Sequence, residues 1–227
     1  MLFRSKERYK EWCVQLQELS SLTIPRCIKP HNFNVSSIEF HHFADASTSG
    51  YGVCSYVRFI DHNGSVSVSL VYAKSRVSPI KPVTIPRLEL TAAVLAVRCS
   101  VMLEREFKFE CPVKHFFYSD STVVLGYISN STRRYQLFVA NRVGVIQSLT
   151  SVSQWSHVAG KQNPADLASR GCLPTVHHPK NVNIDGRFQF ISMPNIGLYF
   201  HGRSFYRGSY LHVVAIFRLQ PKDVAKV

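Results

Sequence analysis

Apolar and polar positions in the first half of the chain follow the pattern of β-strands. Three runs qualify: SIEFHHFAD at 37–45, YGVCSYVRFI at 51–60 and SVSVSLVYA at 65–73. The third alternates between apolar and polar residues, which indicates a strand with one buried face. The stretch DHNG at 61–64 separates the last two runs, and Asn-Gly between β-rich segments is a hairpin signal. The pattern therefore predicts three consecutive antiparallel strands.

Helical spacing begins after the proline-containing stretch KSRVSPIKPVTIP at 74–86. Apolar residues then recur every three or four positions, at Leu88, Ala92, Leu95, Cys99 and Met102. Pro86 stands just ahead of them, where a helix tolerates proline. Further along, the chain predicts a buried strand at 113–119, helices at 121–128 and 135–149, a strand at 152–160 and a helix at 163–171. The predicted order is β-β-β-α-β-α-α-β-α, and no internal repeat is visible.

Two flanking regions differ from this central part. Residues 1–36 predict a short helix, KERYKEWCVQLQEL, and an irregular connector around TIPRCIKPHN. Residues 172–227 contain many aromatic and arginine side chains without periodicity, and they predict no defined structure. We therefore expect a domain at 37–171 between an N-terminal helix with its connector and a tail of unknown structure.

Composition indicates a folded, basic protein. The 227 residues are 45% apolar and 12% aromatic, which favours a single core and excludes a disordered chain. The net charge of +13 is typical of proteins that contact phosphate. The six cysteines include no C-x-x-C pair, the N-terminus lacks the apolar core of a signal peptide, and no run approaches the roughly 20 apolar residues of a membrane helix. We expect an intracellular protein away from membranes, in a cytoplasmic particle or in the nucleus, with reduced thiols.

Four carboxylates stand out because acidic residues are scarce. Residues 41–170 contain fourteen Lys and Arg but eight Asp and Glu. Asp45, Glu89, Asp120 and Asp166 each lie at an element boundary or on a helix face near small residues. Each also has an ordinary structural interpretation. Asp45 can form an Asx turn, Glu89 can be a solvated helix residue, and Asp120 can be the N-cap of the next helix. Asp166 can favour the first turn of its helix through the helix dipole.

Taken together, the four carboxylates predict a metal site. Asp45 ends the first strand and Asp120 the fourth, and ligand sites in α/β folds form where adjacent strands end. Two neighbouring carboxylates repel each other unless a cation lies between them. The helix with Glu89 can approach the sheet through its alanines, and Asp166 can reach the same point from the last helix. Oxygen ligands of this kind favour a hard divalent cation, foremost Mg²⁺.

Several linked motifs carry a family resemblance. FADASTSGYG, IPRLELTAAVLA, FYSDSTVVLGYI, FVANRV and HVAGKQNPADLASRG resemble the ribonuclease H region of BEL/Pao-type LTR retrotransposon Pol polyproteins, a region also labelled Pao retrotransposon peptidase. The resemblance covers roughly residues 10–171, and IPR at 24–26 fits the segment that follows the reverse transcriptase there. It implies an α/β, ribonuclease H-like five-stranded mixed sheet, with strands one to three antiparallel and helices on both faces.

The resemblance also implies an activity. Asp45, Glu89, Asp120 and Asp166 become the catalytic set that binds two Mg²⁺ ions, or Mn²⁺ in their place. The reaction is endonucleolytic hydrolysis of the RNA strand of RNA–DNA hybrids, and the implied partners are the hybrid and the reverse transcriptase and integrase parts of a parent polyprotein. Residues suited to bind hydroxyls and phosphates of the hybrid are Ser47, Thr48, Ser121, Thr122, Arg133, Arg134 and Arg142.

The chain departs from the family pattern in two places. Many ribonucleases H have a catalytic histidine in the loop before the last aspartate. Here that loop is VAGKQNPA, and His157 falls within the predicted strand. We interpret His157 as a core or surface residue without a catalytic part. After Gly171 the sequence does not continue into an integrase, which indicates a polyprotein fragment.

Four other interpretations stay open at this stage. The domain can be a catalytically inactive nucleic-acid-binding remnant. An aspartic peptidase needs D-[ST]-G loops, whereas Asp45 stands in ADAS. An integrase or transposase core uses a glutamate where Asp166 stands. Zinc binding by Cys172 with His177 and His178 lacks a second ligand pair.

Overall fold

A computed structural model describes residues 27–130 and 134–171, with short pieces at 7, 10–11, 13–15, 132, 183–184, 188–189 and 212–215. The described pieces between 7 and 15 are helical, as the sequence predicts for that segment. In the tail, the described pieces are the strands β6 (Asn183–Ile184), β7 (Phe188–Gln189) and β8 (His212–Ala215). The division of the chain at residues 36 and 171 stays a prediction.

The first three strands form the predicted antiparallel meander. They are β1 (Val35–Ala46), β2 (Gly50–Asp61) and β3 (Val66–Val77). At the turn between β2 and β3, the Asp61 carboxylate accepts hydrogen bonds from the backbone N–H of Asn63 (2.8 Å) and of Ser65 (2.7 Å). The Asn-Gly hairpin is therefore confirmed.

Two further strands extend the sheet on the other side of β1. The strand β4 (Val113–Ser119) runs parallel to β1, and β5 (Trp155–His157) runs parallel to β4. These five strands lie in the order 3-2-1-4-5 and form the mixed sheet of the ribonuclease H fold, as expected. The short β8 adds an antiparallel sixth strand beside β3, which the sequence did not predict.

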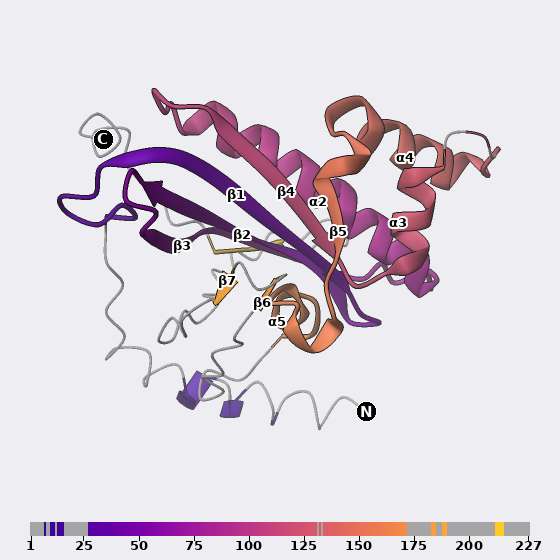
Figure 1. Ribbon diagram of the computed structural model, residues 1–227. Coiled ribbons are helices and arrows are strands. Elements are labelled where there is room, and N and C mark those ends of the chain that lie inside the picture. The colour runs from indigo at the N-terminus through magenta and orange to yellow at the C-terminus, as the bar shows by residue number, and fades with distance from the viewer. Residues whose placement is uncertain are drawn as a thin grey trace.

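Helices cover both faces of this sheet (Figure 1). The helices α2 (Ile85–Glu106), α3 (Thr122–Ser129) and α4 (Leu137–Leu149) lie on one face, and α5 (Ala165–Arg170) lies on the other. The helix α2 begins next to Pro86, as predicted. Ala92, Ala93 and Ala96 of α2 are fully buried, so small side chains bring this helix close to the sheet.

The core has two parts, one on each face. The larger part lies between the sheet and helices α2–α4 and includes Phe40, Val57 and Leu90. The smaller part includes Phe43 and Tyr118 and extends to Ala168 of α5. Gly52 of β2 lies directly under α5, since a Cβ atom at this position would be 2.6 Å from the Cβ of Ala168. The absence of a side chain at Gly52 thus lets α5 rest on the sheet.

The predicted strand at 152–160 is shorter in the structure. Residues Val152–Gln154 form the 3₁₀ turn η2, β5 covers only Trp155–His157, and Gly160–Gln162 form the 3₁₀ turn η3. A capping box between Ser151 and Gln154 holds η2 and delays the start of the strand. In the described part of the chain, no helix has the length and apolar character needed to span a membrane.

Candidate functional site

Asp45 and Asp120 lie side by side at the ends of two parallel strands. The pairing of β1 with β4 continues to Ala44 and Ser119. Asp45 is the next residue after Ala44, and Asp120 is the next residue after Ser119. Paired residues of neighbouring strands direct their side chains to the same face of a sheet. The structure therefore brings together two carboxylates that are far apart in the sequence.

The Asp45 carboxyl is buried, with only 5% of the residue exposed. Its pKa is raised to about 6, first by burial and then by the charges of Asp120 and Asp166, while a hydrogen bond from Ser169 and the charge of Arg170 oppose the shift. That bond is donated by the Ser169 hydroxyl to Asp45 Oδ2. An Asx turn is thus not the role of Asp45: the turn after β1 is closed by Ser47, whose Oγ accepts from the backbone N–H of Ser49 (3.1 Å).

Asp120 follows β4 and is half-buried. Burial raises the pKa of Asp120, and Asp166 contributes in the same direction, whereas His157 and a side-chain hydrogen bond with Asp45 oppose the shift. Its Oδ1 atom is buried and has no hydrogen-bond partner within the part of the chain that the structure describes. The other oxygen of Asp120, Oδ2, lies close to the backbone of Gly160, since a Cβ atom at Gly160 would be 3.0 Å from it.

Asp166 brings a third carboxylate from α5. It stands in the first turn of this helix, and its charge raises the pKa of both Asp45 and Asp120. Arg170, one turn further along, forms an ion pair with it, with 2.5 Å between Nε and Asp166 Oδ1. Asp45, Asp120 and Asp166 are thus close enough for their negative charges to interact, and we refer to these three residues as the carboxylate cluster.

Glu89 reaches the site from the opposite face and is less directly coupled. The Ser121 hydroxyl donates a hydrogen bond of 2.6 Å to Glu89 Oε2. Neither the pKa shift of Asp45 nor that of Asp120 has Glu89 among its causes. Ser121 is also the N-cap of α3, since its Oγ accepts from the backbone N–H of Val124 (3.3 Å). The expected alternative of Asp120 as the N-cap is therefore wrong, because Ser121 occupies that position.

Hydrogen bonds from three strand or loop side chains attach α5 to the sheet. The Ser47 hydroxyl donates to the Ser169 carbonyl (2.8 Å), and the Ser75 hydroxyl donates to the Ala168 carbonyl. Asn163 donates from Nδ2 to the Ala44 carbonyl (3.0 Å) and accepts at Oδ1 from the backbone N–H of Ala165. These bonds hold Asp166 and Ser169 over the end of β1.

The four polar residues predicted to contact substrate divide into two kinds. Ser47 and Ser121 are buried and engaged with α5 and Glu89, respectively. Thr48 and Thr122 are exposed beside them. The structure thus gives Ser47 and Ser121 positioning contacts, and leaves the two threonine side chains facing solvent at the same end of the sheet.

The three predicted basic residues also differ. Arg133 lies outside the described residues. Arg134 is exposed before α4. Arg142 is partly buried: its Nε donates to Thr91 Oγ1 (3.2 Å), and its guanidinium stacks 3.5 Å from the centroid of the Phe138 ring. The bond to Thr91 joins α4 to α2, and the contact with Phe138 lies within α4, which gives Arg142 a packing role.

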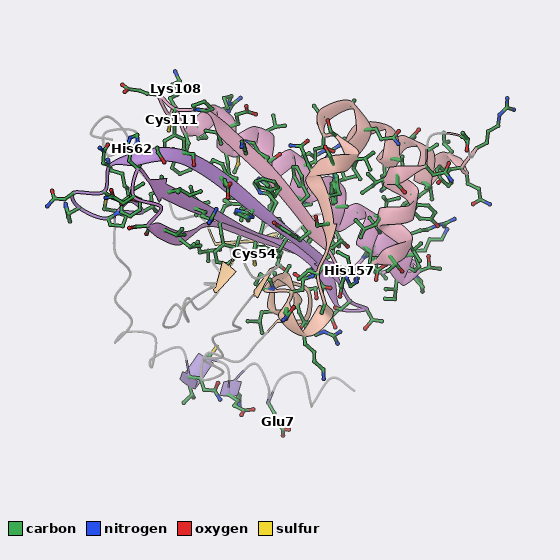
Figure 2. All side chains as sticks on the ribbon, in the orientation of Figure 1. Glu7, Cys54, His62, Lys108, Cys111 and His157 are labelled. Atoms are coloured by element: carbon green, nitrogen blue, oxygen red, sulfur yellow. The ribbon has the colours of Figure 1, made fainter. Side chains whose placement is uncertain are left out.

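His157 lies at the end of β5 (Figure 2). It is exposed and pairs in register with Ser119, the residue before Asp120. It lies close enough for its charge to lower the pKa of Asp120. His157 is therefore a surface residue of a strand, as expected, but one at the edge of the carboxylate cluster.

The carboxylate cluster fits a hard divalent cation in its donor chemistry. All donors are oxygens, the charge of Asp166 raises the pKa of both Asp45 and Asp120, and Asp120 Oδ1 is buried with no partner in the described chain. Their present arrangement is different: among the described residues, no three His, Cys, Asp or Glu side chains are grouped for metal coordination. Hydrogen bonds to Ser169, Arg170 and Ser121 engage three of the four carboxylates instead. The proposed zinc ligands Cys172, His177 and His178 lie outside the described residues.

Two residues of the site did not emerge from the sequence. Ser169 gave no signal, because a serine inside a short helix is ordinary and its partner Asp45 is far away in the chain. Arg170 stands four residues after Asp166, and that spacing on a predicted helix is a recognisable ion-pair signal.

Three solved structures to which the chain is similar are described as ribonucleases H. The N-terminal RNase H domain of a Mycobacterium tuberculosis protein, solved as a fusion with maltose-binding protein, is 15% identical, with a TM-score of 0.38 over 59% of this chain and 91% of that chain. RNase H1 from the halophilic archaeon Halobacterium salinarum is 13% identical, with a TM-score of 0.38 over 59% and 95%. LC11-RNase H1 in complex with an RNA/DNA hybrid is 13% identical, with a TM-score of 0.34 over 60% and 96%.

Sequence comparison gives the family. No curated protein matches the chain. A family model described as Pao retrotransposon-like RNaseH-like domain matches residues 4–121, just over half of the chain. The matched segment includes Asp45, Glu89 and Asp120 and ends before Asp166. The chain belongs to the Pao retrotransposon-like RNaseH-like domain family.

Proposed function

We propose that this domain is a divalent-cation-dependent endonuclease that hydrolyses the RNA strand of RNA–DNA hybrids. The observation that supports it best is the cluster of Asp45, Asp120 and Asp166, three mutually repelling carboxylates at the end of the β1–β4 pair. Placing such a cluster in a partly buried site destabilises the fold unless a cation neutralises it. Family membership supports the same function.

The four carboxylates have distinct parts in this proposal. Asp45 and Asp120, whose strands are paired, would be ligands of two Mg²⁺ or Mn²⁺ ions, and Glu89 and Asp166 would complete the ligand set. Bound in this way, the cations would favour ionisation of the attacking water and offset charge on the departing 3′-oxygen. Glu89, held by Ser121, would also orient the RNA through a 2′-hydroxyl. The expected products are RNA with a 3′-hydroxyl and a downstream piece with a 5′-phosphate.

Binding of the hybrid is assigned to residues around this end of the sheet. Thr48 and Thr122 are exposed and suited to hydrogen bonds with hydroxyls or phosphates. Arg134, together with Arg133, would contact phosphates of the DNA strand, in line with the net charge of +13. Ser47, Ser121 and Arg142 would act by positioning the elements around them. The reverse transcriptase and integrase parts of a parent polyprotein remain proposed partners.

A second candidate is a module that binds nucleic acid without cutting it. The observation that favours it is the position of Glu89, whose Oε2 atom accepts from Ser121 and whose charge is not among the causes of the aspartate pKa shifts. A site with three closely coupled carboxylates and a more remote fourth can be poor at catalysis. In this alternative the chain still binds the hybrid, in line with its net charge of +13, and hydrolysis is absent.

A cleavage assay separates the two candidates. The purified full chain is given an RNA–DNA hybrid labelled on the RNA strand, with Mg²⁺ or with EDTA. The variant Asp120→Asn is the matched control, because it keeps the shape of the side chain and removes one charge. RNA fragments that appear with Mg²⁺ and vanish in the variant are the expected result. Hybrid binding without cleavage in both proteins would favour the binding module.

The substrate surface has its own test. Neutral replacement of Arg133 and Arg134 should weaken hybrid binding and reduce its dependence on salt concentration, because fewer counterions are released. Binding is measured by fluorescence anisotropy across a salt series. An unchanged salt slope would show that these two residues touch no phosphate.

A further inference from the structure

We propose that Arg170 is a built-in counter-cation of the carboxylate cluster, one that stabilises the metal-free site and that a divalent cation displaces on binding. This inference rests on the proposed function, since it concerns the same site and the same cations. It adds a residue that competes with the metal and thereby sets the concentration at which the site fills.

The position of Arg170 is the first argument. It is the last residue of α5, one turn after Asp166, and its Nε lies 2.5 Å from Asp166 Oδ1. Hydrogen bonds of Ser47, Ser75 and Asn163 attach the helix that carries both residues to the sheet. The backbone of Arg170 is therefore fixed relative to the carboxylate cluster. The guanidinium is thus held beside an oxygen that the cations are proposed to bind.

The reach of its charge is the second argument. The pKa of Arg170 is raised first by Asp166 and then also by Asp45 and Asp120. In return, Arg170 lowers the pKa of Asp45. The contacts of the helix agree with this reach, because Ser169, the residue before Arg170, donates its hydroxyl to Asp45 Oδ2. The end of α5 therefore contacts both Asp166 and Asp45, which an ordinary ion pair within one helix does not require.

The exposure of the side chain is the third argument. The Arg170 side chain is 67% exposed, whereas that of Asp166 is 26% exposed. An exposed arginine can turn into solvent at small cost, because water replaces its hydrogen bonds. Arg170 can therefore leave when a divalent cation arrives, while Asp166 stays in place.

The competing explanation is a purely local one. A cation in the last turn favours any helix through the dipole, and an Asp–Arg pair at this spacing stabilises an isolated helix. Under that explanation, removing Arg170 weakens α5 and leaves the affinity for metal unchanged or lower. Displacement predicts that removing Arg170 increases the affinity for metal, because the divalent cation no longer competes with the positive charge of the guanidinium.

Isothermal titration of the full chain with Mn²⁺ and with Mg²⁺ tests the proposal without an activity readout. Arg170→Gln should bind metal about threefold to tenfold more tightly than wild type, as expected when one nearby like charge is removed from a partly exposed site. Without metal, its melting temperature should fall, and added metal should raise it by more than in wild type. Arg170→Lys keeps the charge and should stay close to wild type in affinity.

The matched control is Arg105→Gln. Arg105 is also an exposed arginine near a helix C-terminus, paired with a carboxylate at 3.3 Å, but it belongs to α2 and to Glu106. The variant Arg105→Gln lowers the net charge of the protein by the same amount as Arg170→Gln and should leave metal affinity unchanged. Equal tightening in both variants would overturn the proposal, because it would reflect net charge alone.

Two further outcomes are distinguishable. Metal binding by wild type that is unchanged or weakened in Arg170→Gln would overturn displacement and leave the proposed function intact. No metal binding by wild type would overturn both. Should Arg170→Gln fold poorly, Arg170→Lys and Arg170→Met in parallel separate charge from packing, since only loss of the charge should tighten binding.

Discussion

Glu39 and Asp45 lie six residues apart on the same face of β1, yet their surroundings shift their acidity in opposite directions. The pKa of Glu39 falls to about 2, first through a hydrogen bond from His41 and also through Arg58, although burial opposes the shift. The pKa of Asp45 rises to about 6, first through burial and then through Asp120 and Asp166. One carboxylate is neutralised by its neighbours, and the other is placed among like charges.

The neighbours of Glu39 form a satisfied network. Arg58 Nη1 lies 2.7 Å from Glu39 Oε2, and His41 Nε2 lies 3.3 Å from the same atom. Because a carboxylate can only accept, Nε2 must donate, and the neutral His41 ring then accepts at Nδ1 from the Tyr118 hydroxyl (3.0 Å). This network stabilises the pairing of β1 with β4, whereas repulsion among the carboxylates near Asp45 destabilises it. The contrast separates a carboxylate that its neighbours stabilise, Glu39, from one that burial and like charges destabilise, Asp45.

The largest effect is expected when the charge of Asp45 is removed. Asp45→Asn should reduce cleavage of the hybrid by roughly 100-fold or more, since a charge aimed at the reacting centre is lost. Its free energy of unfolding without metal should stay equal or increase, because one repelling carboxylate disappears. Cleavage rate and urea unfolding are measured on the same preparation. A variant that cuts at the wild-type rate would refute the assignment of Asp45.

Removing Glu39 should give the reverse pattern. Glu39→Ala takes the acceptor away from Arg58 and His41, and leaving such buried groups without it costs roughly 1–3 kcal/mol of unfolding free energy. The conservative Glu39→Gln should lose less. Cleavage per folded molecule should remain near wild type, measured well below the melting temperature. Comparable stability of Glu39→Ala and wild type would show that the network contributes nothing.

Much of this contrast was beyond the sequence. Strand alternation, the Asn-Gly turn and Pro86 are local signals, and they predicted the five strands, the hairpin and the start of α2. Asp45 and Asp120 could be paired by reasoning because both end strands. The hydrogen bonds of Ser169 with Asp45 and of Tyr118 with His41 depend on register and helix placement, which no local pattern encodes. Glu39 did not stand out for the same reason, since its ion-pair partner Arg58 lies 19 positions away on β2.

The pH dependence of stability should show the two carboxylates separately. Glu39 has a lowered pKa in the folded state, so its contribution is present above its ordinary value of 4.5 and is lost as pH falls from there towards about 2. Asp45 has a raised pKa, so its penalty is present above about 6 and is relieved as pH falls from there towards 3.8. In EDTA, the melting temperature of wild type should rise relative to that of Asp45→Asn as pH is lowered from 7 to 5, and fall relative to that of Glu39→Gln as pH is lowered below 4.5. The buried His42 and the partly buried His115, whose pKa values burial lowers, destabilise all three proteins alike as pH falls, so the comparison with the variants removes their effect. Asp120, whose pKa burial also raises, keeps part of the first effect in Asp45→Asn. Identical profiles in all three proteins would contradict this prediction.

The smallest effect is expected at His157. It is exposed, so its influence is screened by water, and His157→Ala should keep the cleavage rate within about threefold of wild type. Because its charge lowers the pKa of Asp120, the acid limb of the pH–rate profile should move to slightly higher pH in the variant. A loss of rate at every pH, without such a shift, would give His157 a catalytic part that we do not assign.

The parallel pairing of β1 with β4 also has a consequence for the order of folding. The antiparallel strands β1, β2 and β3 follow one another in the sequence. The strands β1 and β4 also pair, but β2, β3 and α2 lie between them in the sequence. Closing so long a loop carries a large entropic cost and is slow. The same event brings Asp45 against Asp120, so electrostatic repulsion arises at the step that is already the hardest. The domain therefore assembles the carboxylate cluster late, and a partly folded chain carries the aspartates without bringing them together.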